Sequence, residues 1–297
     1  MHSTKITIDT EKRELHFSSP QGMLRSASET SKPISFTANE MVWDDLASKL
    51  RLIGNVEILQ EGCRFQATQD VLFVLTTIEG KKRLRGIETK GEAILTYQDS
   101  TSGLTSHFLP NENSKDSSEV SQNEYVLRSY GSLRIDHQKQ EVKLRSPELP
   151  DGSIAKGKQV HLKDSKGEIY ADKAFLKYDY IEQKMTPARI VLQGNVKMTS
   201  LPSQKNTSQH YVMADRADFM PQSKEMVLKS AKGNRVLLFD QGSNLEVSAP
   251  GIRFNRDHAM DKNTVQGMGD VRFHFVDAEC DQLQRHFSLY EKIGKKN

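Results

Sequence analysis

The segments IYADKAFLKYD (169–179) and IVLQGNVKM (190–198) decide the fold, because the chain repeats this pair of phrases. Each copy alternates apolar and polar residues, reaches an alanine, alternates again, and ends in Gly-Asn-Val or a close variant. Further copies span 34–58, 212–238 and 245–273, and a weaker copy spans 65–95. Alternation with a period of two predicts strands with one face turned inward, and self-similarity at this spacing is typical of repeat architectures.

A step of three residues follows the alanine in each of the four stronger copies, where alternation demands a step of two. The paired positions are Ala38/Met41, Ala171/Ala174, Ala214/Ala217 and Ala249/Ile252. A slip of one residue turns all later side chains to the other face unless a bulge or corner compensates for it. We therefore expect each alanine to lie at a bend, with Phe36, Met41, Val247 and Ile252 all facing inward. Such bends, repeated at one level of a stack, predict two facing, twisted sheets.

The composition sets few limits on function. The chain has 297 residues and a formal net charge of +3, so no charge excess argues for nucleic acid. No cluster of basic residues stands out along the sequence, and we expect ligand binding to depend only modestly on salt.

Cys63 and Cys280 can pair in an oxidising compartment or remain free thiols. No apolar run approaches the length of a membrane span, and the first 25 residues contain no signal-peptide core, so any export signal is expected to have been removed or to lie upstream.

The pattern divides the chain into five parts. Residues 1–33 are a polar segment that can hold an edge strand, 34–97 form a first β block, and 98–124 are a Ser- and Asn-rich stretch expected to be a mobile loop. Residues 125–276 form a second β block. Residues 277–297 are a tail in which 278–293 can form a short helix. Whether the two blocks share one interior stays open at this point.

Motifs for catalysis and metal binding are not convincing. The histidines are scattered singly and lack the spacing of a zinc site, and neither a phosphate-binding loop nor a nucleophile elbow is present. Asp172, Asp215 and Asp218 resemble a carboxylate cluster for glycoside chemistry, but they recur in copies at outward positions. The residues at the Gly-Asn positions also recur, so we expect structural roles for Asn55, Asn195, Asn234 and Asp270. The sequence predicts no enzyme, no metal and no cofactor.

The apolar inward face is the remaining candidate for function. It can be an ordinary closed core or a groove that accommodates acyl chains, and periodicity does not distinguish the two. The candidate lipid-binding residues on this face are Phe36, Met41, Trp43, Leu52, Val56, Ile58, Phe65, Phe73, Leu176, Leu192, Val196, Phe219, Val247, Ile252, Phe254, Val271 and Phe273.

The repeated phrase resembles the OstA-like (LptA-like) family of lipopolysaccharide-transport proteins. The best matches are Ala171-Asp172 and Ala174 with Gly194-Asn195-Val196, and the likeness covers most of 34–275. The resemblance implies an all-β fold of antiparallel strands in a twisted, two-sheet β-jelly roll. It also implies a non-enzymatic periplasmic protein that holds the lipid A acyl chains of lipopolysaccharide in its interior. The soluble bridging component of the family fits this chain best, although the chain is longer than a single family domain and has the polar insertion.

The resemblance further implies partners at both ends. These are other lipopolysaccharide-transport components, joined by edge-strand pairing, or further copies of this chain joined head to tail, because unpaired edges favour added strands. Two alternatives remain: a structural β-solenoid scaffold that assembles end to end without lipid, and a polysaccharide-active β-helix enzyme.

Overall fold

A computed structural model describes residues 1–24, 34–60, 63–78, 80–99, 123–181, 184–200, 209–242, 244–257 and 262–275. Within these ranges the chain forms 25 antiparallel strands and no helix, which confirms the all-β prediction. No membrane-spanning helix is found among these residues. The helix expected at 278–293 and the tail around it lie outside the described residues.

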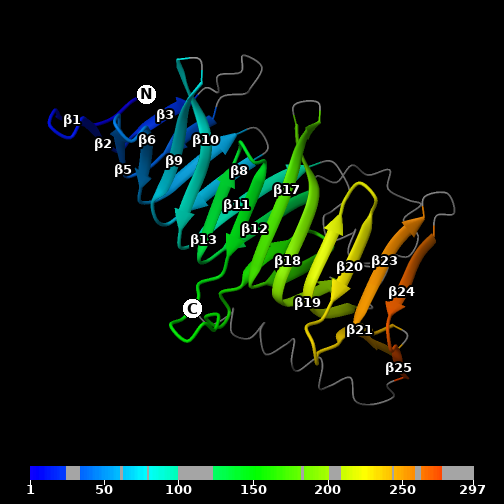
Figure 1. The fold of residues 1–297 in the computed structure, drawn as a ribbon. Helices are drawn as coiled ribbons and strands as arrows, with labels where there is room; N and C mark the ends of the chain where they lie inside the picture. Colours follow the sequence, from blue (N-terminus) through cyan, green and yellow to red (C-terminus); the bar gives the residue numbers. More distant parts are fainter. Residues whose placement is uncertain are drawn as a thin grey trace.

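The strands form one hydrogen-bonded sheet that is folded along its length into two layers (Figure 1). Each layer is a continuous antiparallel ladder, and β18 and β19 pass through both layers. The first layer contains, in spatial order, β1 (Lys5–Asp9), β2 (Glu14–Ser18), β5 (Glu40–Asp44), β6 (Lys49–Ile53), β9 (Val71–Ile78), β10 (Lys81–Lys90), β13 (Ser132–Asp136), β14 (Glu141–Arg145), β17 (Lys173–Ile181), β18 (Lys184–Ser200), β19 (His210–Met220), β20 (Glu225–Lys229), β23 (Gly251–Asp257) and β24 (Lys262–Met268).

The second layer runs beside the first in the same direction. It contains, in spatial order, β3 (Gln21–Leu24), β4 (Ile34–Thr37), β7 (Val56–Gln60), β8 (Cys63–Ala67), β11 (Ala93–Asp99), β12 (Asn123–Ser129), β15 (Val160–Lys163), β16 (Gly167–Ala171), the second half of β18, the first half of β19, β21 (Val236–Asp240), β22 (Leu245–Ala249) and β25 (Arg272–Phe275).

The chain changes layer along one side of the molecule, which we call the spine. Three of the predicted alanine bends lie there: β4 passes into β5 at Ala38, β16 into β17 after Ala171, and β22 into β23 after Ala249. At Ala214 the strand β19 is continuous, and the irregularity lies opposite, between Gln193 and Val196 of β18. Apart from the half-buried Ala38, the residues of the four alanine steps are buried, so the three-residue step does keep both of its residues inward.

The Gly-Asn pairs turn the chain at the spine through left-handed backbone conformations. Gly54 and Asn55 have φ of 68° and 47°, and Gly194 and Asn195 have φ of 75° and 46°. Glycine adopts this region without steric cost, and asparagine tolerates it better than most residues. The conformation therefore explains the choice of Gly and Asn in these two copies, and Gly233 and Gly269 of two further copies also have positive φ.

The opposite side of the molecule carries hairpin turns. The turns 10–13, 45–48, 137–140 and 221–224 each end in a residue with positive φ, namely Arg13, Ser48, Gln140 and Lys224, and Asn244 directly before β22 has the same conformation. Among the described residues, all strand pairings lie within a layer or along the spine, so no backbone ladder joins the two layers at the hairpin side.

The strand ladder runs without interruption between the two predicted β blocks. β10 pairs with β13 in the first layer, and β11 pairs with β12 in the second. The ends of the polar stretch also join the ladder, because Gln98 pairs with Glu124 and Asp99 with Asn123, although this stretch was expected to be irregular from 98 to 124. Residues 100–122 lie outside the described residues.

Candidate functional site: the apolar interior and its open ends

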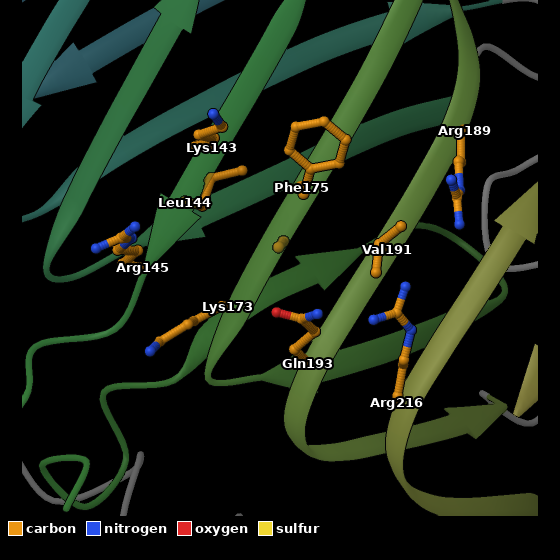
Figure 2. A pocket seen from close by; sticks show the side chains of 10 residues that line it. Lys143, Leu144, Arg145, Lys173, Phe175, Arg189, Val191, Gln193 and Arg216 are labelled. Carbon is orange, nitrogen blue, oxygen red and sulfur yellow. The ribbon is translucent and has the colours of Figure 1, made fainter. Parts of the chain in front are cut away.

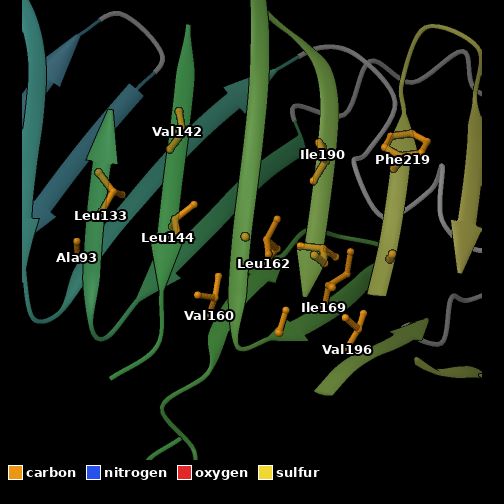
Figure 3. Packing of buried hydrophobic residues seen from close by; sticks show 14 of the residues in the cluster. Ala93, Leu133, Val142, Leu144, Val160, Leu162, Ile169, Ile190, Val196 and Phe219 are labelled. Carbon is orange, nitrogen blue, oxygen red and sulfur yellow. The ribbon is translucent and has the colours of Figure 1, made fainter. Parts of the chain in front are cut away.

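The space between the layers is filled by one continuous cluster of apolar side chains (Figure 3). Antiparallel partners point to the same face of a sheet, so inward residues line up across strands. Leu144 pairs with Ala174, Ala174 with Leu192, and Leu192 with Ala217, and all four are at most 6% exposed. The interior is therefore an apolar layer that extends along the whole stack of strands.

Most of the predicted site residues belong to this interior. Trp43, Leu176 and Val271 are partly buried and pack against the core. The residues that are buried are Phe36, Met41, Leu52, Val56, Ile58, Phe65, Phe73, Leu192, Val196, Phe219, Val247, Ile252 and Phe254. Their assignment as lipid-binding residues remains a prediction.

Phe273 was expected to be an inward residue of the apolar face, but its side chain is 62% exposed. Its register partner in β22 is the buried Val247, so Phe273 lies on the inward face of its layer. β25 is the last strand of that layer in the described residues, and no further strand covers it. Val265 of β24 is similar: it pairs with Phe254 and is 48% exposed. The apolar interior thus continues into an open end.

The other end of the roll is also apolar and open, which the sequence did not reveal. In β1, Ile6 pairs with the buried Phe17, and Ile8 pairs with Leu15, yet the two isoleucines are 57% and 64% exposed. They lie on the inward face of the terminal strand. The segment 1–33 looked polar because each of its three short strands carries only two apolar side chains.

The interior also contains residues outside the predicted set. Leu133, Leu144, Val160 and Ile169 are buried in β13 to β16, and Tyr178 is fully buried. The strands β13 to β15 contain neither the alanine step nor the Gly-Asn phrase. The alternation of apolar and polar residues at 133–135 and 142–144 still indicates strands with one inward face. The Tyr178 hydroxyl lies 3.2 Å from Nδ1 of His137, and burial lowers the pKa of His137.

The repeated acids at the spine hold the turns together. The Asp172 carboxylate accepts hydrogen bonds from the side-chain amides of Asn195 (2.8 Å) and Gln159 (2.9 Å). Asp215 accepts from the Ala231 backbone (2.6 Å) and the Asn234 side chain (3.1 Å). In both copies of the repeat, the aspartate therefore accepts hydrogen bonds from N–H groups of the neighbouring turn. This agrees with the structural role expected for Asp172, Asp215, Asn195 and Asn234.

Asp218 has a different environment on the outer face of the first layer. It accepts a hydrogen bond from Nε of Arg189 (2.8 Å) and lies 3.3 Å from Arg216. The hydrogen bond from Arg189 is the main cause that lowers the pKa of Asp218. In the described part of the chain, no group of three or more His, Cys, Asp and Glu residues is arranged to hold a metal ion.

A polar cluster on the outer face of β15 and β16 centres on Glu168. His161 stacks on Tyr170 with ring centroids 4.4 Å apart, the Tyr170 hydroxyl donates to Glu168 (2.8 Å), and Lys163 lies 2.6 Å from the same carboxylate. The His161 ring, whose Nε2 lies 3.5 Å from the carboxylate, is the main cause that lowers the pKa of Glu168 from 4.5 to about 2, and Lys163 and Tyr170 add to this effect against the opposing effect of burial.

Replacing Glu168 with glutamine should lower the free energy of unfolding by about 1–2 kcal/mol at neutral pH. Because the folded-state pKa lies below the unfolded value, this stabilisation is fully present above the unfolded pKa and is lost as the pH falls toward about 2. Urea unfolding of the wild type and Glu168→Gln should therefore show a gap that narrows between about pH 5 and pH 3. A gap that is independent of pH would mean that the carboxylate charge does not stabilise this cluster.

Similarity to known proteins is found in structure and not in sequence. No family model matches the sequence, and no curated protein matches it. Among the solved structures that are similar is the crystal structure of LptH, the LptA homologous periplasmic component of the conserved lipopolysaccharide transport device from Pseudomonas aeruginosa. The superposition has a TM-score of 0.37 and 9% sequence identity, and it covers 51% of this chain and 93% of that one.

Proposed function

We propose that this protein is a non-enzymatic periplasmic carrier of lipopolysaccharide, and that the acyl chains of lipid A lie between its two layers. The observation that carries the proposal is the apolar interior, which is continuous along the stack and reaches both open ends. The resemblance of the repeated phrase to lipopolysaccharide-transport proteins selects lipopolysaccharide as the ligand.

The energetics favour acyl chains as the ligand of such an interior. Each buried methylene contributes about 0.8 kcal/mol, so a few chains gain a large driving force. Facing layers lie about 10 Å apart and are filled by side chains packed at normal density. Lipid must therefore separate the layers. Opening at the hairpin side breaks no strand pairing among the described residues, whereas the spine keeps its hydrogen bonds.

The open ends are the proposed contacts to partners. β1 and β24 each pair with one neighbour in the first layer of the described chain, and their free edges lie beside exposed inward-facing side chains. A strand from another transport component, or from a second copy of this chain, can pair with such an edge and extend the apolar interior. This arrangement would make the protein one segment of a bridge to the outer membrane.

One observation favours the alternative of a scaffold without lipid. Most predicted site residues are less than 10% exposed, as in an ordinary closed core. The two functions differ in whether lipid reaches these residues.

Photo-crosslinking separates the two functions. A crosslinking residue at Trp43 or Phe254 should capture lipopolysaccharide in living cells, because both side chains belong to the interior. The matched positions Glu57 and Lys197 face outward in β7 and β18, beside the inward Ile58 and Val196, and should capture none. Equal capture at inward and outward positions, or none at all, would favour the scaffold.

A further inference from the structure

The outer face of the first layer brings together basic residues that are far apart in the sequence. Reading across the strands, Arg145 pairs with Lys173, Lys173 with Gln193, Gln193 with Arg216, and Arg216 with Lys229. Since neighbouring strands are about 4.8 Å apart, the row extends over roughly 19 Å. We call these five residues the basic row.

The charges in this row are poorly balanced. Two register pairs, Arg145 with Lys173 and Arg216 with Lys229, place like charges directly opposite each other, which destabilises a sheet. Lys173 has an ion pair with Glu148 (2.8 Å), and Arg216 shares Asp218 with Arg189. Glu148 and Asp218 thus neutralise part of the row, and Arg145 and Lys229 remain as basic residues without an ion pair to any described residue.

A hollow of about 330 Å³ lies over the middle of this row (Figure 2). Figure 2 shows Gln193 between Lys173 and Arg216, with Phe175 and Val191 beside it. Lys143 and Arg189 complete the rim, and the Lys143 ammonium lies 5.6 Å from the centre of the Phe175 ring. Val191 faces outward, is only 6% exposed and lies outside the apolar cluster between the layers, so it forms an apolar floor.

We propose that this hollow binds a small molecule that carries two phosphate groups on a compact body. The volume is at the lower end of the roughly 300–1,000 Å³ that is typical of small-molecule sites. Lys173 and Arg216 line the hollow and are separated by two strand spacings, about 10 Å, so one phosphate can lie at Lys173, flanked by Arg145, and the other at Arg216, with Lys229 on the next strand outside the hollow. The body then rests over Phe175 and Val191. The site lies on the opposite face of the layer from the lipid interior, and neither proposal depends on the other.

Calorimetric titration with glucose 1,6-bisphosphate tests the proposal. Binding should weaken about tenfold or more in the Arg145→Gln/Arg216→Gln double variant, because each change removes one charge from a different phosphate position. Arg51→Gln is the matched control, since Arg51 is an exposed outward arginine of β6 in the same layer, and its affinity should equal that of the wild type. Glucose 6-phosphate should bind about tenfold more weakly than the bisphosphate, because it engages only one charge pair.

A second readout separates a binding role from a structural one. Without ligand, Arg145→Gln should melt at the same temperature as the wild type or higher, because it relieves the repulsion with Lys173. A lower melting temperature would show that Arg145 stabilises the fold and would count against the proposal. Three titration results would overturn it: no binding of the bisphosphate at low ionic strength, equal loss in Arg51→Gln, or binding of poly-glutamate but not of the bisphosphate, which would indicate an acidic protein partner.

Discussion

Replacing Phe219 with alanine should lower the free energy of unfolding by about 3–5 kcal/mol, the largest loss that we expect from truncating a single side chain. Phe219 is 1% exposed in β19, and its register partners Ile190 and Met226 are also buried. Truncation removes the buried ring and leaves a cavity between the layers that rigid neighbouring strands cannot fill. Urea unfolding followed by circular dichroism measures the change.

Phe175→Ala is the matched control, because it truncates the same residue type on the outer face of β17, two strands away in the same layer. Phe175 is only half-buried and lies outside the core, so its loss should be less than about 1.5 kcal/mol. Similar losses for the two variants would mean that the space between the layers is not the principal core.

Replacing Gly194 with alanine should cost about 2–4 kcal/mol. Gly194 has φ of 75°, and an added Cβ would lie 2.9 Å from Cβ and Cγ of Asp172, with a carboxylate oxygen closer still. Asp172 cannot simply move away, because its carboxylate holds Asn195 and Gln159. Backbone strain and crowding therefore add at a turn of the spine.

Gly157→Ala isolates the backbone contribution. Gly157 has φ of 70°, but nothing lies within 4 Å of the added Cβ, so the expected loss is about 1 kcal/mol. The double variant Gly194→Ala/Asp172→Ala should recover part of the loss of Gly194→Ala by removing the clash. If the two glycine variants lose the same amount, the close approach of Gly194 to Asp172 does not constrain the spine.

The repeat allowed much of the fold to be predicted, because its local signals are strong. The step from Ala171 to Ala174 required a bend, and the structure has a corner at that point. The recurrence of Gly-Asn predicted a structural turn, and Gly194 and Asn195 have the left-handed backbone that favours these residues. Both the bend and the turn depend on only a few consecutive residues, so they can be predicted from one sequence alone.

The ends and the outer face could not be predicted in the same way. Ile6 and Phe273 show that an inward position does not imply burial, because burial also requires a neighbouring strand. No basic cluster stands out along the sequence, yet register pairing brings Arg145, Lys173 and Arg216 into one row. The order of the strands in the sheet decides which basic residues become neighbours, and a count of charges along the chain gives no information on that order.

Native mass spectrometry of the protein, purified gently from a lipopolysaccharide-producing host, tests the central claim most directly. The account predicts a population whose mass exceeds that of the bare chain by one lipid A-containing molecule, and fragmentation should release the lipid with its acyl chains. The same protein from a host with blocked lipopolysaccharide synthesis should lack this species. A preparation that contains only the bare chain, from both hosts, would contradict the account.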